Sequence, residues 1–338
     1  MQDHAEATLA AELPEIPLIE ALGPTPSLEM MADEGARLDH LVETARAHYG
    51  RGFIATADRL SRRWVTRNSS PYGEEIAEIA NRMPAPGGWF LNASFEWGCT
   101  AGLARDPDTG AFTLLRVLDW PLPGLGRTLV AAQQRGPAGE FLNLTWPGFA
   151  GAVTAVAAGR FAAALNQAPM PLRGLGKYGD WTVERFRVWR SRELPPMHLL
   201  RQVFERCQNY EDARLALSHT PIAIPAIYVL TGARPGEGCV IERMPHAARL
   251  HDAPVCVANQ WLSSDLKGRD RGTRSGDRLA VMRALTAEAP PWDFDWLAEP
   301  MLNRTTRLAA VLDPAGGRVL ARGYEDDGPA TQTLHLAA

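Results

Sequence analysis

Apolar and polar positions near the start of the chain repeat with a helical period. The run "LDHLVETARAHYG" places its apolar side chains on one face and is predicted to end at Gly50. Two further helices fit "TADRLSRRWV" and "GEEIAEIANRM". We therefore predict helices over about 32–82, after an arm of residues 1–30 that is rich in Pro, Ala and Glu and expected to be loosely ordered. A Pro/Gly break at 84–88 ends this region.

After the break the pattern changes to strands. "GWFLNASFEWGCTAGLARD" is predicted as strand, and "DPDTG" as the turn of a hairpin that continues into "AFTLLRVLDW". More strand-like runs follow in "RTLVAAQQ", "GEFLNLTW", "FAGAVTAVAAG", "RFAAALNQ", "AIYVLTGA", "EGCVIERM" and "APVCVANQW". Residues 195–218 favour one or two helices, "SGDRLAVMRALTAEA" favours a helix with Ser275 at its N-cap, and "DPAGG" favours the turn of a last hairpin. Hairpins without regular βαβ alternation indicate an α+β layered fold.

Composition narrows the class of protein. The chain has 338 residues, 46% of them hydrophobic, and a net charge of −4, so nucleic acid is not expected as a partner. The N-terminus lacks a basic region followed by an apolar one, and the most apolar segment, "GFAGAVTAVAAG", is too short to span a bilayer. We expect a cytoplasmic protein without stable membrane insertion; the sequence leaves open whether it forms homo-oligomers.

Metal and dinucleotide motifs are weak. The cysteines form no CxxC pair, and the histidines form no HExxH, so no metal site is predicted. "LRGLGKYGD" is a literal GxGxxG, but no strand comes directly before it and no apolar helix after it. We interpret this segment as a flexible loop near a site, and a nicotinamide-dependent oxidoreductase is the least favoured class.

Cys99 follows Gly98 at the head of a strand-like run. If the peptide bond between them were cut, Cys99 would carry both a thiol and a free α-amine. An α-amine has a pKa of roughly 7.7–8.0, so it can take the thiol proton itself. Arg116 and Asp119 lie on the second strand of the predicted hairpin, which returns both to the neighbourhood of Cys99. The alternative is a buried structural cysteine beside an ordinary hairpin ion pair.

Three blocks in order resemble the cysteine N-terminal-nucleophile hydrolases, the superfamily that includes acid ceramidase, N-acylethanolamine acid amidase, penicillin V acylase, bile salt hydrolase and isopenicillin N acyltransferase. The first block is "GCT" followed by Arg116 and "DW" at Asp119–Trp120. The second is "WPGFAGAVTAVAAGRFAAALNQ", and the third is "VANQW" followed by a helix with a Ser-x-x-Arg pattern at Ser275 and Arg278. The resemblance covers roughly residues 90–290.

The resemblance implies a four-layer αββα sandwich and autocatalytic cleavage between Gly98 and Cys99. Residues 1–98 would then be a small helical pro-segment that stays bound to a core of residues 99–338. Asn259 would be a side-chain oxyanion donor, and Arg278 would shape the electrostatics of the site, with Arg271 and Arg274 competing for that position.

The expected function is amide hydrolysis of a small-molecule N-acyl amide through a thioester, without a metal or organic cofactor. Asn166, Gln167 and Trp120 are candidate substrate-binding residues, although Gln167 stands where the ceramidase-like members have an acidic residue. An aromatic flank favours an apolar acyl group, and it is equally consistent with core packing; it comprises Trp89, Phe90, Phe95, Trp97 and Trp120. The alternatives are an acyltransferase of the isopenicillin N type and a non-catalytic binding protein on the same fold.

Overall fold

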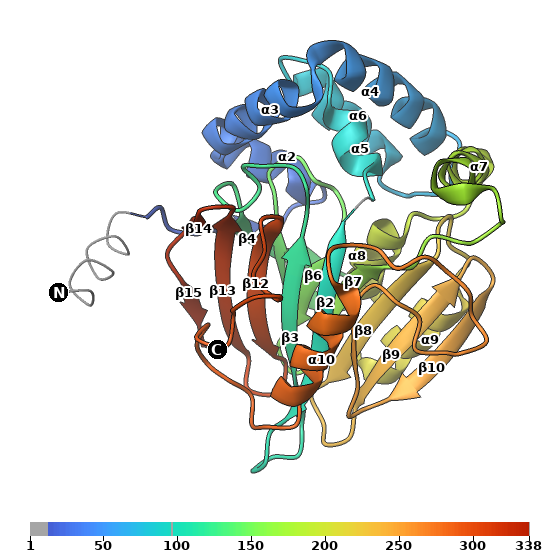
Figure 1. The fold of residues 1–338 in the computed structure, drawn as a ribbon. Coiled ribbons are helices and arrows are strands. Elements are labelled where there is room, and N and C mark those ends of the chain that lie inside the picture. Colours follow the sequence, from blue (N-terminus) through green and yellow to red (C-terminus); the bar gives the residue numbers. More distant parts are fainter. Residues whose placement is uncertain (1–12, 96, 338) are drawn as a thin grey trace.

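Two β-sheets packed face to face form the body of the protein (Figure 1). The computed structural model describes residues 13–95 and 97–337. Sheet A contains, in spatial order, β1 (Leu18–Ala21), β4 (Val130–Gly136), β5 (Gly139–Thr145), β6 (Thr154–Ala157), β7 (Phe161–Gln167), β8 (Ala226–Gly232), β9 (Gly238–Met244) and β10 (Ala247–Asp252). Sheet B contains β11 (Cys256–Val257), β2 (Gly98–Arg105), β3 (Phe112–Asp119), β12 (Thr306–Asp313), β13 (Arg318–Glu325), β14 (Gly328–Pro329) and β15 (Leu334–Leu336), which pairs with β13.

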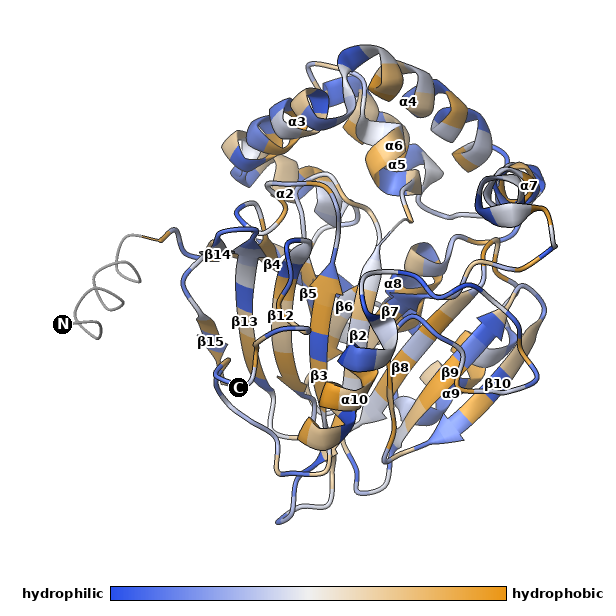
Figure 2. Ribbon diagram, in the orientation of Figure 1, coloured by the Kyte–Doolittle hydropathy of each residue, from blue (hydrophilic) through white to orange (hydrophobic). Residues whose placement is uncertain are grey.

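Helices cover the outer faces of both sheets. Helices α8 (Pro196–Arg206) and α9 (Tyr210–His219) pack on sheet A, and α10 (Ser275–Leu285) packs on β2 and β11 of sheet B. The central strands β3 and β7 are buried along their length and mostly hydrophobic, with a few polar positions (Figure 2). The predicted α+β fold with four αββα layers is confirmed.

A group of helices arches over one end of the sandwich, at the top of Figure 1. It comprises α2 (Pro26–Asp33), α3 (Gly35–Tyr49), α4 (Arg51–Val65), α5 (Gly73–Arg82) and α6 (Gly88–Ala93). The helices predicted over 32–82 are confirmed, and α3 ends at Gly50, whose φ of 83° suits a residue without a Cβ. We call α2–α6 the helical segment. No helix in the described residues is both long enough and apolar enough to cross a membrane.

The expectation of a loosely ordered arm over 1–30 is wrong for the part that the structure describes. Residues 1–12 lie outside the described residues, but β1 pairs in parallel with β4, with Leu18 opposite Ala131. The strand alternates exposed and buried side chains, and Ile19 and Ala21 face the protein. Backbone pairing with sheet A therefore orders a segment whose composition suggested a coil.

Three local predictions also differ from the structure. The run after the Pro/Gly break forms α6 before the chain enters β2, and Asn92 fixes this turn by donating to the carbonyls of Gly88 and Gly148. The segment interpreted as a flexible loop opens α7 (Gly176–Arg190). Ser275 is the first residue of α10 and not its N-cap, because its hydroxyl accepts the Asn259 N–H.

The hairpin β2–β3 forms as predicted and sets the register around Cys99. Asp106 accepts the N–H groups of Asp108 and Thr109 in the turn, which closes between the two strands. Gly98 pairs with Asp119, Cys99 with Leu118, and Ala101 with Arg116. The two charged residues of β3 consequently lie beside the start of β2.

Candidate active site

The thiol of Cys99 lies in the space between the two sheets and is fully buried. Its Sγ accepts a hydrogen bond from Arg116 Nη2 at 3.0 Å and donates to the Leu165 carbonyl at 3.6 Å. Burial raises the pKa of the thiol above its usual value, and the Arg116 charge only partly opposes this. In the continuous chain the thiol is therefore held protonated and shielded from solvent.

Arg116 is fixed from the opposite sheet. Its Nη2 also donates to the Leu165 carbonyl at 2.9 Å, and its Nη1 donates to Asn166 Oδ1. Asn166 in turn donates to the carbonyls of Val257 and Ala258, at 3.3 and 3.1 Å. Asn166 is fully buried and both of its polar side-chain atoms are engaged, so in this structure it holds Arg116; its predicted contact with substrate stays a prediction.

Asn259 contacts the other side of Cys99. Its Oδ1 accepts the Cys99 N–H at 2.7 Å, and its Nδ2 donates to the Gln167 carbonyl at 2.8 Å. The Cys99 N–H can meet only an acceptor, which fixes the orientation of the Asn259 amide. The first residue of α10 holds the backbone of Asn259 in place, because the Asn259 N–H donates to Ser275 Oγ at 3.0 Å.

Arg278 takes the position for which three arginines compete in the sequence. Its Nη1 donates to the Cys99 carbonyl at 2.7 Å and its Nη2 to Asn259 Oδ1 at 3.1 Å. Arg274 instead lies exposed and pairs with Asp277 at 2.8 Å. Arg271 is half-buried in the loop before α10 and lines a cavity beside the site.

Asp119 has one engaged oxygen and one that makes no hydrogen bond to the described residues. Oδ1 accepts from Thr306 Oγ1 at 2.9 Å and from Asn303 Nδ2 at 3.1 Å. Oδ2 lies 3.3 Å from Arg278 Nη1, outside hydrogen-bonding geometry. Burial raises the pKa of Asp119, although the Arg278 charge opposes this shift. Beside the Gly98–Cys99 junction, Oδ2 is therefore in an ion pair with Arg278 but accepts no hydrogen bond from the described residues, and buried carboxylate oxygens normally accept one.

Gly98 occupies a space that admits no side chain without displacement. A Cβ there would lie 3.3 Å from Asp119 Cβ and 3.3 Å from the Gly272 Cα. Gly272 itself has a φ of 71°, which favours glycine. Two glycines thus let the loop before α10 approach the junction closely.

Two cavities open beside this junction. The first, of about 700 Å³, reaches Gly98 and Asp119 and is bounded by Trp97, Gln167 and the loop containing Arg271. The second, of about 430 Å³, is lined mainly by apolar side chains of α4, α6 and α7. The two cavities share Pro121 and Trp181 as lining residues, so they adjoin.

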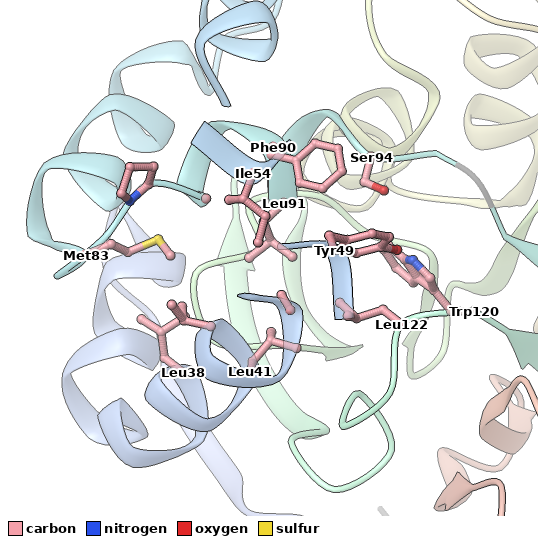
Figure 3. A pocket seen from close by; sticks show the side chains of 14 residues that line it. Leu38, Leu41, Tyr49, Ile54, Met83, Phe90, Leu91, Ser94, Trp120 and Leu122 are labelled. Atoms are coloured by element: carbon pink, nitrogen blue, oxygen red, sulfur yellow. The ribbon is translucent and has the colours of Figure 1, made fainter. Parts of the chain in front are cut away.

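The second cavity continues into the helical segment. A small pocket of about 50 Å³ shares Tyr49, Phe90, Ser94 and Trp120 with it, and Figure 3 shows the side chains of Leu41, Ile54 and other apolar residues surrounding this pocket. Trp120, which follows Asp119 directly, lines both of these apolar spaces, and its role in binding substrate stays a prediction. We call the cavity of about 430 Å³ together with this pocket the apolar chamber.

Several residues of the site were not predicted from the sequence. Thr306 and Asn303, which hold Asp119, belong to the C-terminal part of the chain and to no recognised motif. Gln167 was predicted only as a substrate contact, yet its backbone N–H faces the Cys99 thiol and its Oε1 accepts the Trp97 N–H at 3.0 Å. In the described residues, no three His, Cys, Asp or Glu side chains gather in a way that could hold a metal ion.

Comparisons with known proteins were made by sequence and by structure. No family model matches the chain. A probable acid ceramidase from Caenorhabditis elegans is 24% identical over 211 residues, covering 57% of this chain and 52% of the relative. An N-acylethanolamine-hydrolyzing acid amidase from Cavia porcellus is 25% identical over 182 residues, covering 51% of this chain and 48% of the relative. The chain thus spans about half the length of the curated relatives it matches.

The fold also has a counterpart among solved structures. The C. elegans ortholog of N-acylethanolamine-hydrolyzing acid amidase superposes with a TM-score of 0.51 at 18% identity, covering 70% of this chain and all of that one. The chain has the fold of this protein. Its predicted resemblance to the cysteine N-terminal-nucleophile hydrolases is therefore confirmed by sequence relatives and by fold.

Proposed function

We propose that the chain is an autoproteolytically activated amidohydrolase that uses Cys99 to cleave N-acyl amides with an apolar acyl group. One observation carries this proposal. Around the Gly98–Cys99 junction, the structure gathers a cation on the thiol, an acceptor on the Cys99 nitrogen and an unsatisfied carboxylate oxygen, all beside an accessible cavity. A structural cysteine needs none of these groups.

The first reaction would be cleavage of the chain. Cys99 Sγ attacks the Gly98 carbonyl carbon, the thiol proton passes to the Cys99 nitrogen, the C–N bond breaks, and the acyl group is left on sulfur as a thioester. Water then hydrolyses the thioester, leaving the Gly98 carboxylate and a free Cys99 α-amine. Arg278 holds the Cys99 carbonyl and Asn259 holds its nitrogen, so the new N-terminus stays in place.

Asp119 would bind that new amine. Its Oδ2 has no hydrogen-bond partner in the described part of the chain and would lie 3.5 Å from a Cβ placed on Gly98. Cleavage gives the Cys99 nitrogen additional hydrogens, so the Asp119 and Asn259 oxygens can each accept one. The nearby Arg278 and Arg116 charges favour the neutral amine, which is the form that acts as a base.

Turnover would repeat this chemistry on a substrate. The α-amine takes the thiol proton, and the thiolate, next to Arg116, attacks the amide carbonyl. The second hydrogen of Asn259 Nδ2 and the backbone N–H of Gln167 are suited to stabilise the oxyanion. The amine leaves with the proton, and water resolves the thioester. Asn259 would thus act on both the base and the oxyanion.

The apolar chamber would receive the acyl group. Its lining includes Phe90, Phe95 and Trp120 from the predicted aromatic flank, whereas Trp89 is packed in the core. The amine half of the substrate would occupy the more polar cavity of about 700 Å³. This division explains why an aromatic flank accompanies a buried nucleophile.

After cleavage, residues 1–98 would remain attached to the core. Strand β1 is hydrogen-bonded within sheet A, and Glu75 of α5 forms a buried ion pair of 2.7 Å with Arg201 of α8. Asn92 adds hydrogen bonds to the Gly148 carbonyl and from the Ala150 N–H. The chamber needs this attachment, because α4 and α6 supply one of its walls.

The intact mass of purified wild type beside Cys99→Ala tests the proposal. We expect the wild type to convert into fragments ending at Gly98 and beginning at Cys99, and the variant to remain whole. Cleaved wild type should then hydrolyse N-acyl amides, and alkylation of the thiol should stop it. A wild type that stays intact, with a thiol inert to alkylation, contradicts the proposal and supports the non-catalytic alternative.

Acyl transfer is the alternative outcome of the same thioester, since a second amine can replace water. The relatives reported above are named as a ceramidase and an amide-hydrolyzing enzyme, which favours hydrolysis. Competition settles this point: primary amines added to the reaction should leave the free acid as the main product. Transfer products exceeding the free acid would establish an acyltransferase.

A further inference from the structure

The cavity of about 700 Å³ beside Cys99 has two buried hydrogen-bond donors in its wall. Trp97 and Gln167 both line it, and they are only 4% and 6% exposed. Neither Trp97 Nε1 nor Gln167 Nε2 has a hydrogen-bond partner among the described residues. Gln167 Oε1 accepts the backbone N–H of Trp97 at 3.0 Å. That N–H can meet only an acceptor, so the Gln167 amide cannot be turned around to remove the unmet donor.

Two unmet donors on neighbouring side chains indicate a ligand that accepts hydrogen bonds. Polar groups that are buried in proteins are nearly always hydrogen-bonded, because an unmet donor keeps the full cost of leaving water. Here both donors belong to the wall of an accessible cavity that also reaches Gly98, next to the nucleophile. The acceptor that they lack among the described residues is therefore expected from a molecule that enters this cavity.

Cationic side chains surround the same cavity. Lys177 and Arg269 line it, both are exposed, and neither forms an ion pair with the described residues. The backbone of Arg269 is held at the wall, because it exchanges two hydrogen bonds, of 2.8 and 2.9 Å, with Met170. The cavity thus offers two positive charges that can act on a bound ligand.

The negative charge of the cavity is smaller or already paired. The described lining residues include two carboxylates, Asp119 and Asp270. Asp119 lies 3.3 Å from Arg278 in a buried ion pair, and Asp270 is exposed beside Arg269 in the chain. A ligand that brings its own negative charge therefore suits this cavity better than one that brings a second positive charge.

We propose that this cavity binds a carboxylate on the amine half of the substrate, so that the substrates are N-acyl amino acids. The carboxylate accepts the Trp97 and Gln167 N–H groups and is attracted by the charges of Arg269 and Lys177. A carboxylate only accepts hydrogen bonds, and it has an oxygen for each donor. The hydroxyl of an amino alcohol can meet a donor, but it gains little from the two cations. This inference rests on the proposed function, which supplies the amide that is cleaved.

Binding tests the inference without any turnover. Isothermal titration of the full-length Cys99→Ala chain compares N-octanoylglycine with N-octanoylglycinamide and N-octanoylethanolamine, which share one acyl chain and lack the charge. We expect N-octanoylglycine to bind at least tenfold more tightly than either neutral ligand, and this difference should shrink at high salt. Equal binding of the three, or tighter binding of a neutral ligand, overturns the inference.

Two variants separate the charge from the buried donors. Arg269→Gln should lower the affinity for N-octanoylglycine about tenfold and leave the affinity for N-octanoylethanolamine unchanged. Gln167→Glu keeps an acceptor for the Trp97 N–H and replaces the unmet donor with a negative charge, so the neutral ligands should now bind more tightly than N-octanoylglycine. A preference for N-octanoylglycine that survives both substitutions contradicts the proposed site.

Arg206 offers a matched control. It is exposed at the end of α8 and is not among the residues that line the cavity. Arg206→Gln makes the same chemical change as Arg269→Gln, and this variant should keep the parent's preference for N-octanoylglycine. Equal losses in the two arginine variants would mean that the overall charge of the protein, and not this cavity, attracts the ligand.

Activity distinguishes failure of this inference from failure of the proposed function. Cleaved wild type should show the same order in kcat/KM, and Arg269→Gln should lower only the value for N-octanoylglycine. Hydrolysis of all three compounds at equal kcat/KM would overturn the inference and leave the amidohydrolase standing. Preferential binding by a chain that never cleaves would refute the catalytic proposal alone. If the continuous chain excludes all three ligands, the ratio of kcat/KM decides, and a chain that neither binds nor cleaves overturns both.

Discussion

The sandwich around Cys99 and the helical segment above it are built on opposite principles. In the sandwich, Arg116, Asn259 and Arg278 are fully buried. Their side chains form a hydrogen-bonded network that joins β2, β3, β7 and α10. In the helical segment, apolar side chains surround unfilled space. The comparison suits the division of tasks that we propose: the fixed polar groups would cleave the bond, and the loosely filled apolar wall would select the acyl group.

The difference also predicts how each region tolerates change. A buried polar network loses function when one member is removed, because the remaining groups are left unsatisfied. An apolar cavity accepts changes in shape and loses only the matching part of the ligand's binding energy. Mutations at the contact between the two regions, in the sandwich, or in the helical segment should therefore have effects of different magnitude. They should also differ in whether they change stability, reaction rate or substrate preference.

Breaking the contact between the helical segment and the sandwich should have the largest effect on stability. Glu75 of the helical segment is buried, pairs with Arg201 and accepts the Ser27 N–H at 2.9 Å. Glu75→Gln leaves Arg201 with Glu205, at 2.8 Å, as its remaining carboxylate partner and turns the charge-assisted bonds of Glu75 into neutral ones, so we expect it to lower the free energy of unfolding by about 2–3 kcal/mol. Urea unfolding of the uncleaved Cys99→Ala chain measures this loss, and gel filtration of the cleaved variant should show release of residues 1–98.

The same helix offers a control. Glu78 pairs with Arg82 on the exposed face of α5, so Glu78→Gln should change the free energy of unfolding by less than about 0.5 kcal/mol. If both substitutions cost the same, the buried pair does not connect the two regions.

Removing one member of the polar network should affect rates more than folding. Asn259→Ala removes the acceptor for the Cys99 nitrogen and the proposed oxyanion donor, so autocleavage and turnover should each slow by about 10²–10³-fold, or about 3–4 kcal/mol. Time courses of fragment formation, and kcat per cleaved chain, measure this. Asn209→Ala, which deletes the N-cap of α9 far from the site, should cost about 1 kcal/mol of stability and leave both rates unchanged. Equal rates for Asn259→Ala and wild type would remove Asn259 from the mechanism.

Local sequence patterns predicted the part of the site that local structure builds. A hairpin turn after Arg105 is enough to bring Arg116 and Asp119 back beside Cys99, and the register bears this out. Asn259 and Arg278 lie 160 and 179 residues from Cys99. No periodicity connects positions so far apart, and they entered the prediction only through the resemblance of whole blocks.

The helical segment shows where such reasoning stops. Its helices were predicted, because their apolar positions repeat, but α6 was predicted as strand because a short apolar run fits either element. Hydrogen bonds from Asn92 to the Gly88 and Gly148 carbonyls stabilise the helix, and Gly148 is distant in sequence. The sequence also could not tell which residues of the aromatic flank pack in the core and which line a cavity. Trp89 and Trp120 look alike in sequence, and only packing separates them.

Acid should weaken the contact between the two regions. His198 of α8 is fully buried, bonds to Ser70 Oγ at 2.8 Å, and has a second ring nitrogen without a partner among the described residues. Burial lowers the pKa of His198 to about 3, so the unfolded chain takes up a proton below pH 6.5 while the folded chain does not. The free energy of unfolding should therefore be highest above pH 6.5 and should have fallen by about 3 kcal/mol at pH 4.

The variant His198→Gln tests this origin. Urea unfolding of the uncleaved chain at pH 7, 5.5 and 4 should show a shallower loss than in the parent, because no buried imidazole remains to be protonated. His246 is exposed, so His246→Gln should keep the parent's slope. Identical slopes in all three chains would mean that other groups control the acid response.

Filling the apolar chamber should have the smallest effect and the most selective one. Ala57 of α4 lines the chamber, and a phenyl ring placed there would exclude two or three methylene groups of an acyl chain. At about 0.8 kcal/mol for each methylene, Ala57→Phe should lower kcat/KM for long-chain acyl amides by about 30-fold. Short-chain substrates, which do not reach α4, should keep their rates. Ala55→Phe adds the same ring to the same helix, and Ala55 is not among the chamber's lining residues, so it should lower neither rate. If Ala57→Phe slowed long and short substrates equally, the helical segment would be acting on the chemistry itself, and the division of tasks between the two regions would be wrong.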